Sequence, residues 1–187
     1  PPFILLFVGS GLFFGWAYSA PPLRFVDRGL GELSTMIAFG FFLPCSGYLF
    51  LAGGLDLSIL PLAIPLLFLG LFFIVSVELP DAGNDRRMGK RTLVVRFGPR
   101  TALAFGTAAA FLTSAGFLAA AIMGIRPVAF FAAASVASLV PVLMGIAGIV
   151  QGAGDFRAAE AITGRNIASL VVFCLASVAA LLLIVPG

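Results

Sequence analysis

The segment from Glu78 to Thr92 holds the residues that could do chemistry in an otherwise apolar chain. Its three acids, Glu78, Asp81 and Asp85, are spaced i, i+3 and i+7. In a helix, at about 100° per residue, their carboxylates lie within an arc of roughly 60°. Carboxylates this close repel one another and are costly to desolvate unless a cation lies between them. The spacing therefore predicts an acidic helix face that binds a cation.

Four basic residues follow these acids, namely Arg86, Arg87, Lys90 and Arg91. Oxygen ligands without histidine suit Mg²⁺ or Mn²⁺ better than zinc, and Mg²⁺ usually combines one or two carboxylates with substrate phosphates. The basic residues would neutralise the remaining phosphate charge. The segment thus predicts half of a site for a metal and a diphosphate. The alternative is a solvated loop whose acids pair with its own arginines.

The composition is that of a polytopic membrane protein. Of the 187 residues, 61% are hydrophobic and 10% are charged, and the mean hydropathy is +1.16. Soluble domains are about half apolar and about a quarter charged. The net charge of +3 then reflects orientation in the lipid bilayer, and we expect no nucleic-acid partner. The sequence has no histidine, which excludes histidine-ligated zinc or haem and Ser-His or Cys-His catalysis.

Apolar runs long enough to cross about 30 Å of hydrocarbon predict six transmembrane helices in one all-α domain, 1–187. They cover 3–18, 33–52, 60–79, 102–124, 128–150 and 166–185. Each run is apolar nearly all round, so none would be stable alone in water. Cys45 and Cys174 lie within such runs and are interpreted as packing residues.

The positive charges predict the orientation of the bundle. If successive helices alternate in direction, connections 19–32, 80–101 and 151–165 share one side. They hold ten of the eleven Lys and Arg residues, and the other side holds Arg126. This bias predicts that the three connections are cytoplasmic, in an integral protein of the cell (inner) membrane. The last one, 151–165, has no metal-ligand spacing and is interpreted as a helix connection, with a substrate contact as the alternative.

The first connection begins with Tyr18-Ser-Ala-Pro-Pro-Leu-Arg24. The two prolines end the helix and favour an extended turn, which would hold Tyr18 and Arg24 at the membrane surface. Taken alone, Tyr18 is interpreted as one of the aromatic residues that are common at the membrane interface, and Arg24 as one of the basic residues that are common in cytoplasmic loops. If this connection faces the acidic segment across a shared cytoplasmic mouth, Arg24 becomes a candidate ligand of a diphosphate.

Together these motifs resemble the UbiA superfamily of intramembrane prenyltransferases over the whole chain. The segments that carry the resemblance are Tyr18 to Arg24, Gly29-Leu-Gly31-Glu32, Asp81-x-x-x-Asp85-Arg-Arg-x-Gly89-Lys90-Arg91-Thr92-Leu93 and Val95-Arg96-Phe-Gly98. The resemblance implies a bundle of nine transmembrane helices, six of them present here, with a cavity open to lipid and capped on the cytoplasmic side. Two aspartate-rich motifs there bind Mg²⁺ and the diphosphate of a polyprenyl donor.

By this resemblance, Asp81 and Asp85 are catalytic residues and the metal ligands of the second motif. Tyr18 and Arg24 are catalytic residues of the loop near the diphosphate. The residues that the resemblance assigns to substrate binding are Tyr18, Arg24, Glu78, Arg86, Lys90 and Arg91.

The first aspartate-rich motif of the superfamily, an Asn and two Asp at helical spacing, would lie upstream. No Asn precedes Asn84, and the chain begins with Pro1-Pro2 and lacks the pattern of a signal peptide. We therefore expect an N-terminally truncated domain that lacks some three helices and half of the metal site, and that is inactive alone.

The implied reaction ionises the donor, so that an electron-rich acceptor carbon attacks an allylic cation in a cavity poor in water. The sequences of these motifs favour quinone biosynthesis, such as that of menaquinone, with a quinone precursor such as dihydroxynaphthoate or hydroxybenzoate as the aromatic acceptor. The branches of the superfamily that act in haem, chlorophyll and archaeal ether-lipid synthesis stay open as alternatives. Hypotheses of other classes are a small transporter or cation channel and a structural membrane subunit. Acids that line an ion path usually lie mid-span, whereas these acids lie at the mouth.

Overall fold

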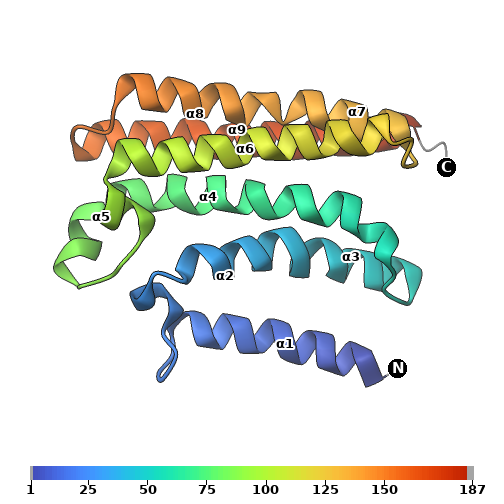
Figure 1. The fold of residues 1–187 in the computed structure, drawn as a ribbon, viewed down its shortest axis with the longest axis horizontal. Coiled ribbons are helices and arrows are strands. Elements are labelled where there is room, and N and C mark those ends of the chain that lie inside the picture. The colour runs from blue at the N-terminus through green and yellow to red at the C-terminus, as the bar shows by residue number, and fades with distance from the viewer. Residues whose placement is uncertain (1, 185–187) are drawn as a thin grey trace.

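Helices are the expected outcome for this composition, because backbone polar groups in hydrocarbon must be satisfied within the segment that crosses it. The computed structural model describes residues 2–184, and within that range it contains helices and no strand (Figure 1). The elements, in chain order, are α1 (Pro2–Ser19), η1 (Phe25–Arg28), α2 (Gly31–Ile37), η2 (Ala38–Phe42), α3 (Leu43–Ala52), η3 (Leu57–Ile59), α4 (Leu60–Arg87), α5 (Leu93–Phe97), α6 (Pro99–Ile122), α7 (Val128–Ala137), α8 (Leu139–Gln151) and α9 (Phe156–Ile184).

The prediction of an all-α polytopic bundle is confirmed. Within residues 2–184, the helices that are long and apolar enough to cross a membrane are Gly31–Ala52, Leu57–Arg87, Pro99–Ile122, Val128–Gln151 and Phe156–Ile184. The apolar helix Ile4–Ser19 is shorter, as the short first run of the sequence predicted. All six predicted spans thus coincide with helices, although residue 185 at the end of the last one lies outside the described residues.

Two predicted boundaries are wrong. The third predicted span ends at residue 79, but the helix that contains it, α4, continues to Arg87 and includes the charged turns. The last helix was predicted to begin at residue 166, with 151–165 as a connection, but α9 begins at Phe156. The Asp155 carboxylate accepts a hydrogen bond from Ala158 N at 2.8 Å, which caps this helix ten residues early. Both errors come from ending helices where hydropathy falls, although a helix needs backbone hydrogen bonds rather than apolar side chains.

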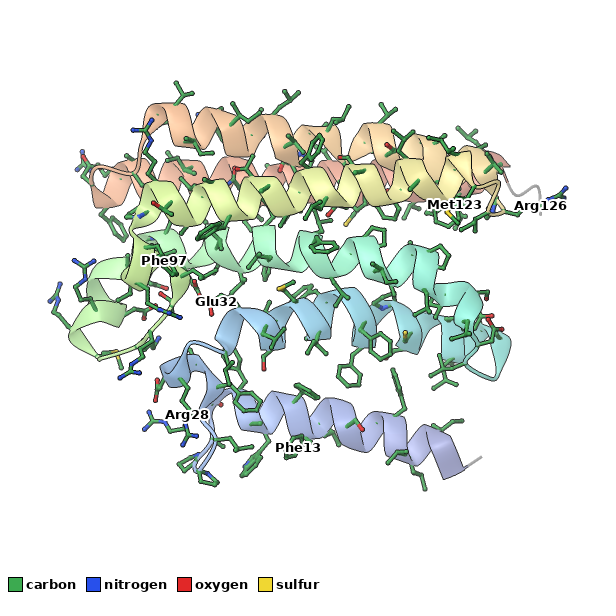
Figure 2. The ribbon with its side chains drawn as sticks, in the orientation of Figure 1. Phe13, Arg28, Glu32, Phe97, Met123 and Arg126 are labelled. Atoms are coloured by element: carbon green, nitrogen blue, oxygen red, sulfur yellow. The ribbon has the colours of Figure 1, made fainter. Side chains whose placement is uncertain are left out.

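The three basic connections lie at the same end of the bundle, as predicted. Figure 1 shows the α1–α2, α4–α6 and α8–α9 connections at one end and the α3–α4 and α6–α7 turns at the other. Figure 2 accordingly places Arg28 and Arg126 at opposite ends. We call the end with Arg28 the basic end. That this end faces the cytoplasm stays a prediction.

Helix α4 lies at the centre of the bundle, between two groups of helices. It contacts α2 and η2 on one side and α6 and α9 on the other. Close approach depends on small residues, because a Cβ at Gly40 of η2 would overlap the backbone of Leu67 in α4. Similarly, Gly70 of α4 lies against Met36 of α2, where an added Cβ would be 3.0 Å from Met36 Cα. Helix α2 and η2 are thereby held directly against α4.

We predict that Gly40→Ala destabilises the bundle, by about 1–3 kcal/mol or more, because the added methyl group forces α2 and η2 away from α4. Gly47→Ala in α3 is the matched control, since a Cβ there meets nothing within 4 Å. Thermal unfolding of both variants in detergent measures the difference. Equal midpoints in the two variants would contradict the close helix contact described here.

Candidate active site

The two motif-bearing segments meet at the basic end. The Glu32 carboxylate, at the start of α2, accepts a hydrogen bond from Leu93 N at the start of α5. Gly29 lies against the backbone of Arg91, where an added Cβ would be 3.0 Å from the Arg91 carbonyl oxygen. In Figure 2, Glu32 lies at the start of α2, beside α4 and the α4–α5 connection. The predicted juxtaposition of connections 19–32 and 80–101 is therefore present in the structure.

Three carboxylates are buried beneath this contact. Glu32, Glu78 and Asp85 expose 5%, 7% and 5% of their surface. Glu78 lies close enough to Glu32 and Asp85 for charge interactions with both, and its Oε2 atom is buried without a hydrogen-bond partner. Carboxylates in such surroundings repel one another, so the cluster is stabilised by any positive charge that enters it.

Lys90 supplies one such charge. Its Nζ lies 2.7 Å from Asp85 Oδ1, and its backbone N–H donates to the Asp85 carbonyl oxygen at 3.0 Å. The hydrogen bond to the Asp85 carboxylate raises the pKa of the Lys90 ammonium above its usual value, with smaller contributions from Tyr18 and Asp81. Gly89, with φ of +73°, forms the turn that brings Lys90 back towards the helix it has just left.

Tyr18, at the end of α1, lies near the same cluster. Its ring packs against Gly31, where an added Cβ would be 3.5 Å from the ring. The phenol is within the range of charge interactions with Glu32, Glu78, Asp85 and Lys90. A phenol can both donate and accept a hydrogen bond, so Tyr18 can orient an oxygen-rich ligand at this position.

The acidic segment is helical, as its spacing required, and α4 carries Glu78, Asp81 and Asp85 on neighbouring turns. Asp81 is exposed, while Asp85 one turn later is buried. Lys90 lies within reach of both charges. The helix thus offers one carboxylate that is free to meet a ligand from solution and one that is already neutralised by the protein.

The predicted arginines lie around this cluster rather than in it. Arg24 is exposed and pairs with Asp27, with 2.8 Å between Arg24 Nε and Asp27 Oδ2. Arg86 is exposed and donates to the Val95 carbonyl oxygen at 3.4 Å. Arg91 is also exposed. The structure therefore brings together Tyr18, Glu78, Asp85 and Lys90, with Asp81 in reach of Lys90, and leaves the arginine side chains at the rim.

Within residues 2–184, no three His, Cys, Asp or Glu side chains converge as they would around a metal held by protein ligands alone. Mg²⁺ usually takes one or two carboxylates and completes its shell with water and substrate phosphate. The hard oxygens of Asp81 and Asp85, and the unpartnered buried Oε2 of Glu78, fit that kind of cation. These residues could hold Mg²⁺ together with a phosphate-bearing substrate.

Two pockets lie among the helices, and one of them reaches Tyr18 at the basic end. One, of about 300 Å³, lies between α1 and α2 and η2, with Tyr18, Ser34 and Thr35 in its walls. The other, of about 470 Å³, lies between η2, α3, α4 and α9 and has an almost entirely apolar lining. Phe39 lines both pockets. The pocket with Tyr18 can hold a hydrocarbon chain with its polar end towards the carboxylates, and the larger pocket offers apolar volume deeper in the bundle.

Glu32 is the site residue that sequence reasoning did not assign. Glu32 belongs to one of the segments that carry the family resemblance. Nothing in the sequence shows that its carboxylate bonds Leu93 N, 61 residues later. The available signal was its type, because a Glu at the start of an apolar helix is costly to bury without a donor. That signal marks Glu32 as a residue with a partner and does not identify the partner.

Comparison with known proteins gives a consistent result. The model of the UbiA prenyltransferase family matches residues 1–161. The chain is 27% identical over 100 residues to a 2-carboxy-1,4-naphthoquinone phytyltransferase of Synechocystis sp., which covers 52% of this chain and 32% of that protein. The match thus spans about a third of the length of this curated relative. No solved structure matches the chain significantly.

We predict that Glu32→Ala releases the α4–α5 connection, because Leu93 N loses its acceptor. Glu32→Gln keeps an oxygen acceptor and should behave like the parent. Trypsin can cut after Arg86, Lys90 and Arg91 in this connection, and we expect cleavage there to be about tenfold faster in Glu32→Ala. Glu160→Ala, at an exposed position of α9, is the control. Cleavage rates that do not separate Glu32→Ala from Glu160→Ala would show that Glu32 does not hold the connection.

Lys90 is the single lysine of the sequence, and its raised pKa predicts a response to alkaline pH. The stability it adds is fully present below the ordinary value of 10.5 and is lost as pH rises through the higher folded-state pKa. Lys90→Arg stays charged over this range. We therefore expect the thermal midpoint of the parent to fall more than that of Lys90→Arg between about pH 10 and about pH 12. Parallel curves for the two proteins would argue against the ion pair of Lys90 with Asp85.

Proposed function

We propose, from the premise that the chain belongs to the UbiA prenyltransferase family, that it forms the second half of an active site for prenyl transfer to an aromatic quinone precursor. The observation that carries the proposal is that polar residues of three segments meet at one end of an apolar bundle, next to the pocket lined by Tyr18. These residues are Tyr18, Glu32, Glu78, Asp85 and Lys90. Since the chain matches a third of its curated relative, activity, substrates and partners of the whole protein are part of this proposal.

The residues at the basic end suit a diphosphate. Lys90 has three N–H groups and uses one on Asp85, so the others can face phosphate oxygens. Tyr18 lies close enough to donate a further hydrogen bond, and the exposed Arg86 and Arg91 add positive charge at the rim. Mg²⁺ bound by Asp81 and Asp85 would supply the charge withdrawal that helps the diphosphate to leave.

The apolar pockets suit the prenyl chain of the donor. In the reaction the carbon–oxygen bond to the diphosphate breaks, and a bond forms between the allylic carbon and an aromatic carbon of the acceptor, which loses a proton or a carboxyl group. The allylic cation must be kept from water, and the pocket walls are hydrocarbon and aromatic rings, including Phe39, which lines both pockets. The pockets therefore support a long apolar donor.

The acceptor is best sought among carboxylated aromatic compounds. The Synechocystis relative is a 2-carboxy-1,4-naphthoquinone phytyltransferase, so its acceptor carries a carboxyl group. The exposed arginines at the basic end would attract such an anion.

The bias of positive charge further supports an integral protein of the cell membrane with connections 19–32, 80–101 and 151–165 in the cytoplasm.

The test uses membranes that contain the full gene product, with Mg²⁺, a labelled polyprenyl or phytyl diphosphate and a panel of dihydroxynaphthoate, carboxynaphthoquinone and hydroxybenzoate acceptors. We expect prenylated product from at least one acceptor. Asp81→Asn and Asp85→Asn should each lower the rate about 100-fold, because they weaken the hold on the metal and the diphosphate.

Glu160→Gln, an exposed acid on α9, is the control and should keep the parent rate. Removal of Mg²⁺ with a chelator should stop the reaction, and Mg²⁺ should restore it. Absence of product from every acceptor, or full activity of both aspartate variants, would refute the proposed function.

A further inference from the structure

The carboxylate-bearing end of α4 follows a break in its hydrogen-bond ladder. Pro80 lies inside α4, directly before Asp81. A proline has no N–H and its ring crowds the carbonyl four residues earlier, which here is that of Ser76. The last two turns of α4, from Asp81 to Arg87, are therefore joined to the rest of the helix with one backbone hydrogen bond missing.

Helix α9 supplies the missing donor. Thr163 Oγ1 donates to the Ser76 carbonyl oxygen at 2.6 Å, across 87 residues of sequence. Most threonines inside helices bond a carbonyl of their own helix, as Thr107 does with Leu103 at 2.7 Å. Thr163 instead bonds the one carbonyl of α4 that Pro80 deprives of its helical partner.

A second contact fixes the same turn. Asn166 is fully buried, and its Nδ2 donates to Ser76 Oγ at 2.9 Å. Ser76 Oγ donates its own hydrogen to the Phe72 carbonyl oxygen at 2.7 Å, so it can only accept from Asn166. The Ser76 side chain and the Ser76 carbonyl are therefore both held by α9, two residues before the buried Glu78.

We infer that Thr163 and Asn166 are positioning residues, which set the direction of the Asp81–Arg87 turns by holding α4 at its proline. They touch neither the proposed metal nor the diphosphate. In hydrocarbon an unpartnered carbonyl beside a proline would let the end of α4 move, and the carboxylates would move with it. The claim that this affects catalysis rests on the proposed function; the claim about the helix does not.

The first measurement is hydrogen–deuterium exchange of the full gene product in lipid nanodiscs. Thr163→Val removes the hydroxyl at equal size and should speed exchange of the amides in 81–87 about tenfold. Thr163→Ser keeps the hydroxyl and should restore parent exchange. Thr107→Val is the matched control, because it removes a buried hydroxyl that bonds only its own helix. Parent-like exchange of 81–87 in Thr163→Val would overturn the inference.

The second measurement is steady-state prenyl transfer. We expect Thr163→Val to raise the KM for the prenyl diphosphate and the Mg²⁺ requirement about tenfold, with rescue in Thr163→Ser and parent values in Thr107→Val. Equal changes in Thr163→Val and Thr107→Val would show a general packing effect and overturn the positioning role. If the parent itself makes no product, the proposed function fails, while exchange in 81–87 still decides whether α9 holds α4.

Discussion

The basic end of this bundle is organised by the cost of burying carboxylates. Glu32, Glu78 and Asp85 are all more than nine-tenths buried, and one ammonium, that of Lys90, lies among them. An unpaired buried charge costs several kcal/mol, of order 3–5 when one partner of a pair is removed. The surrounding chain is arranged to lower that cost, since Gly89 turns Lys90 back onto Asp85 and α5 begins where its first N–H can reach Glu32.

This arrangement explains why the charged residues lie at one end while the pockets run into the bundle. Several buried hydroxyl groups within the membrane-spanning helices bond one another or a backbone carbonyl, as Ser114 and Ser138 do at 2.8 Å. Apolar and aromatic side chains then line the pocket walls, and Tyr18 marks the boundary where the pocket between α1 and α2 meets the carboxylates. An amphiphilic ligand fits this arrangement, with its anionic head at the charged end and its hydrocarbon tail in the apolar pocket.

The sequence predicted the features that depend on local composition and period. Six apolar runs became helices, and the i, i+3, i+7 spacing placed Glu78, Asp81 and Asp85 on one helix. Helix ends were predicted less well, because α9 begins at a hydrogen-bond cap, Asp155, rather than where hydropathy rises. The ion pair between Arg24 and Asp27 was not predicted, because it depends on the backbone direction at a turn where Arg24 has φ of +41°. The role of Arg24 as a diphosphate ligand stays a prediction.

The contacts that the sequence did not predict join residues that lie far apart in the chain. Glu32 meets Leu93 across 61 residues, and Ser76 meets Thr163 and Asn166 across 87 and 90 residues. The sequence shows that Pro80 removes one backbone hydrogen bond from a helix. It does not show which distant donor bonds the carbonyl left without its partner. Because α4 lies between α2 and α9, its charged end receives Glu32 from one neighbour and the hydroxyl of Thr163 from the other. The site on α4 therefore depends on three helices, and its distance from α2 depends on the close contact that Gly40 and Gly70 allow.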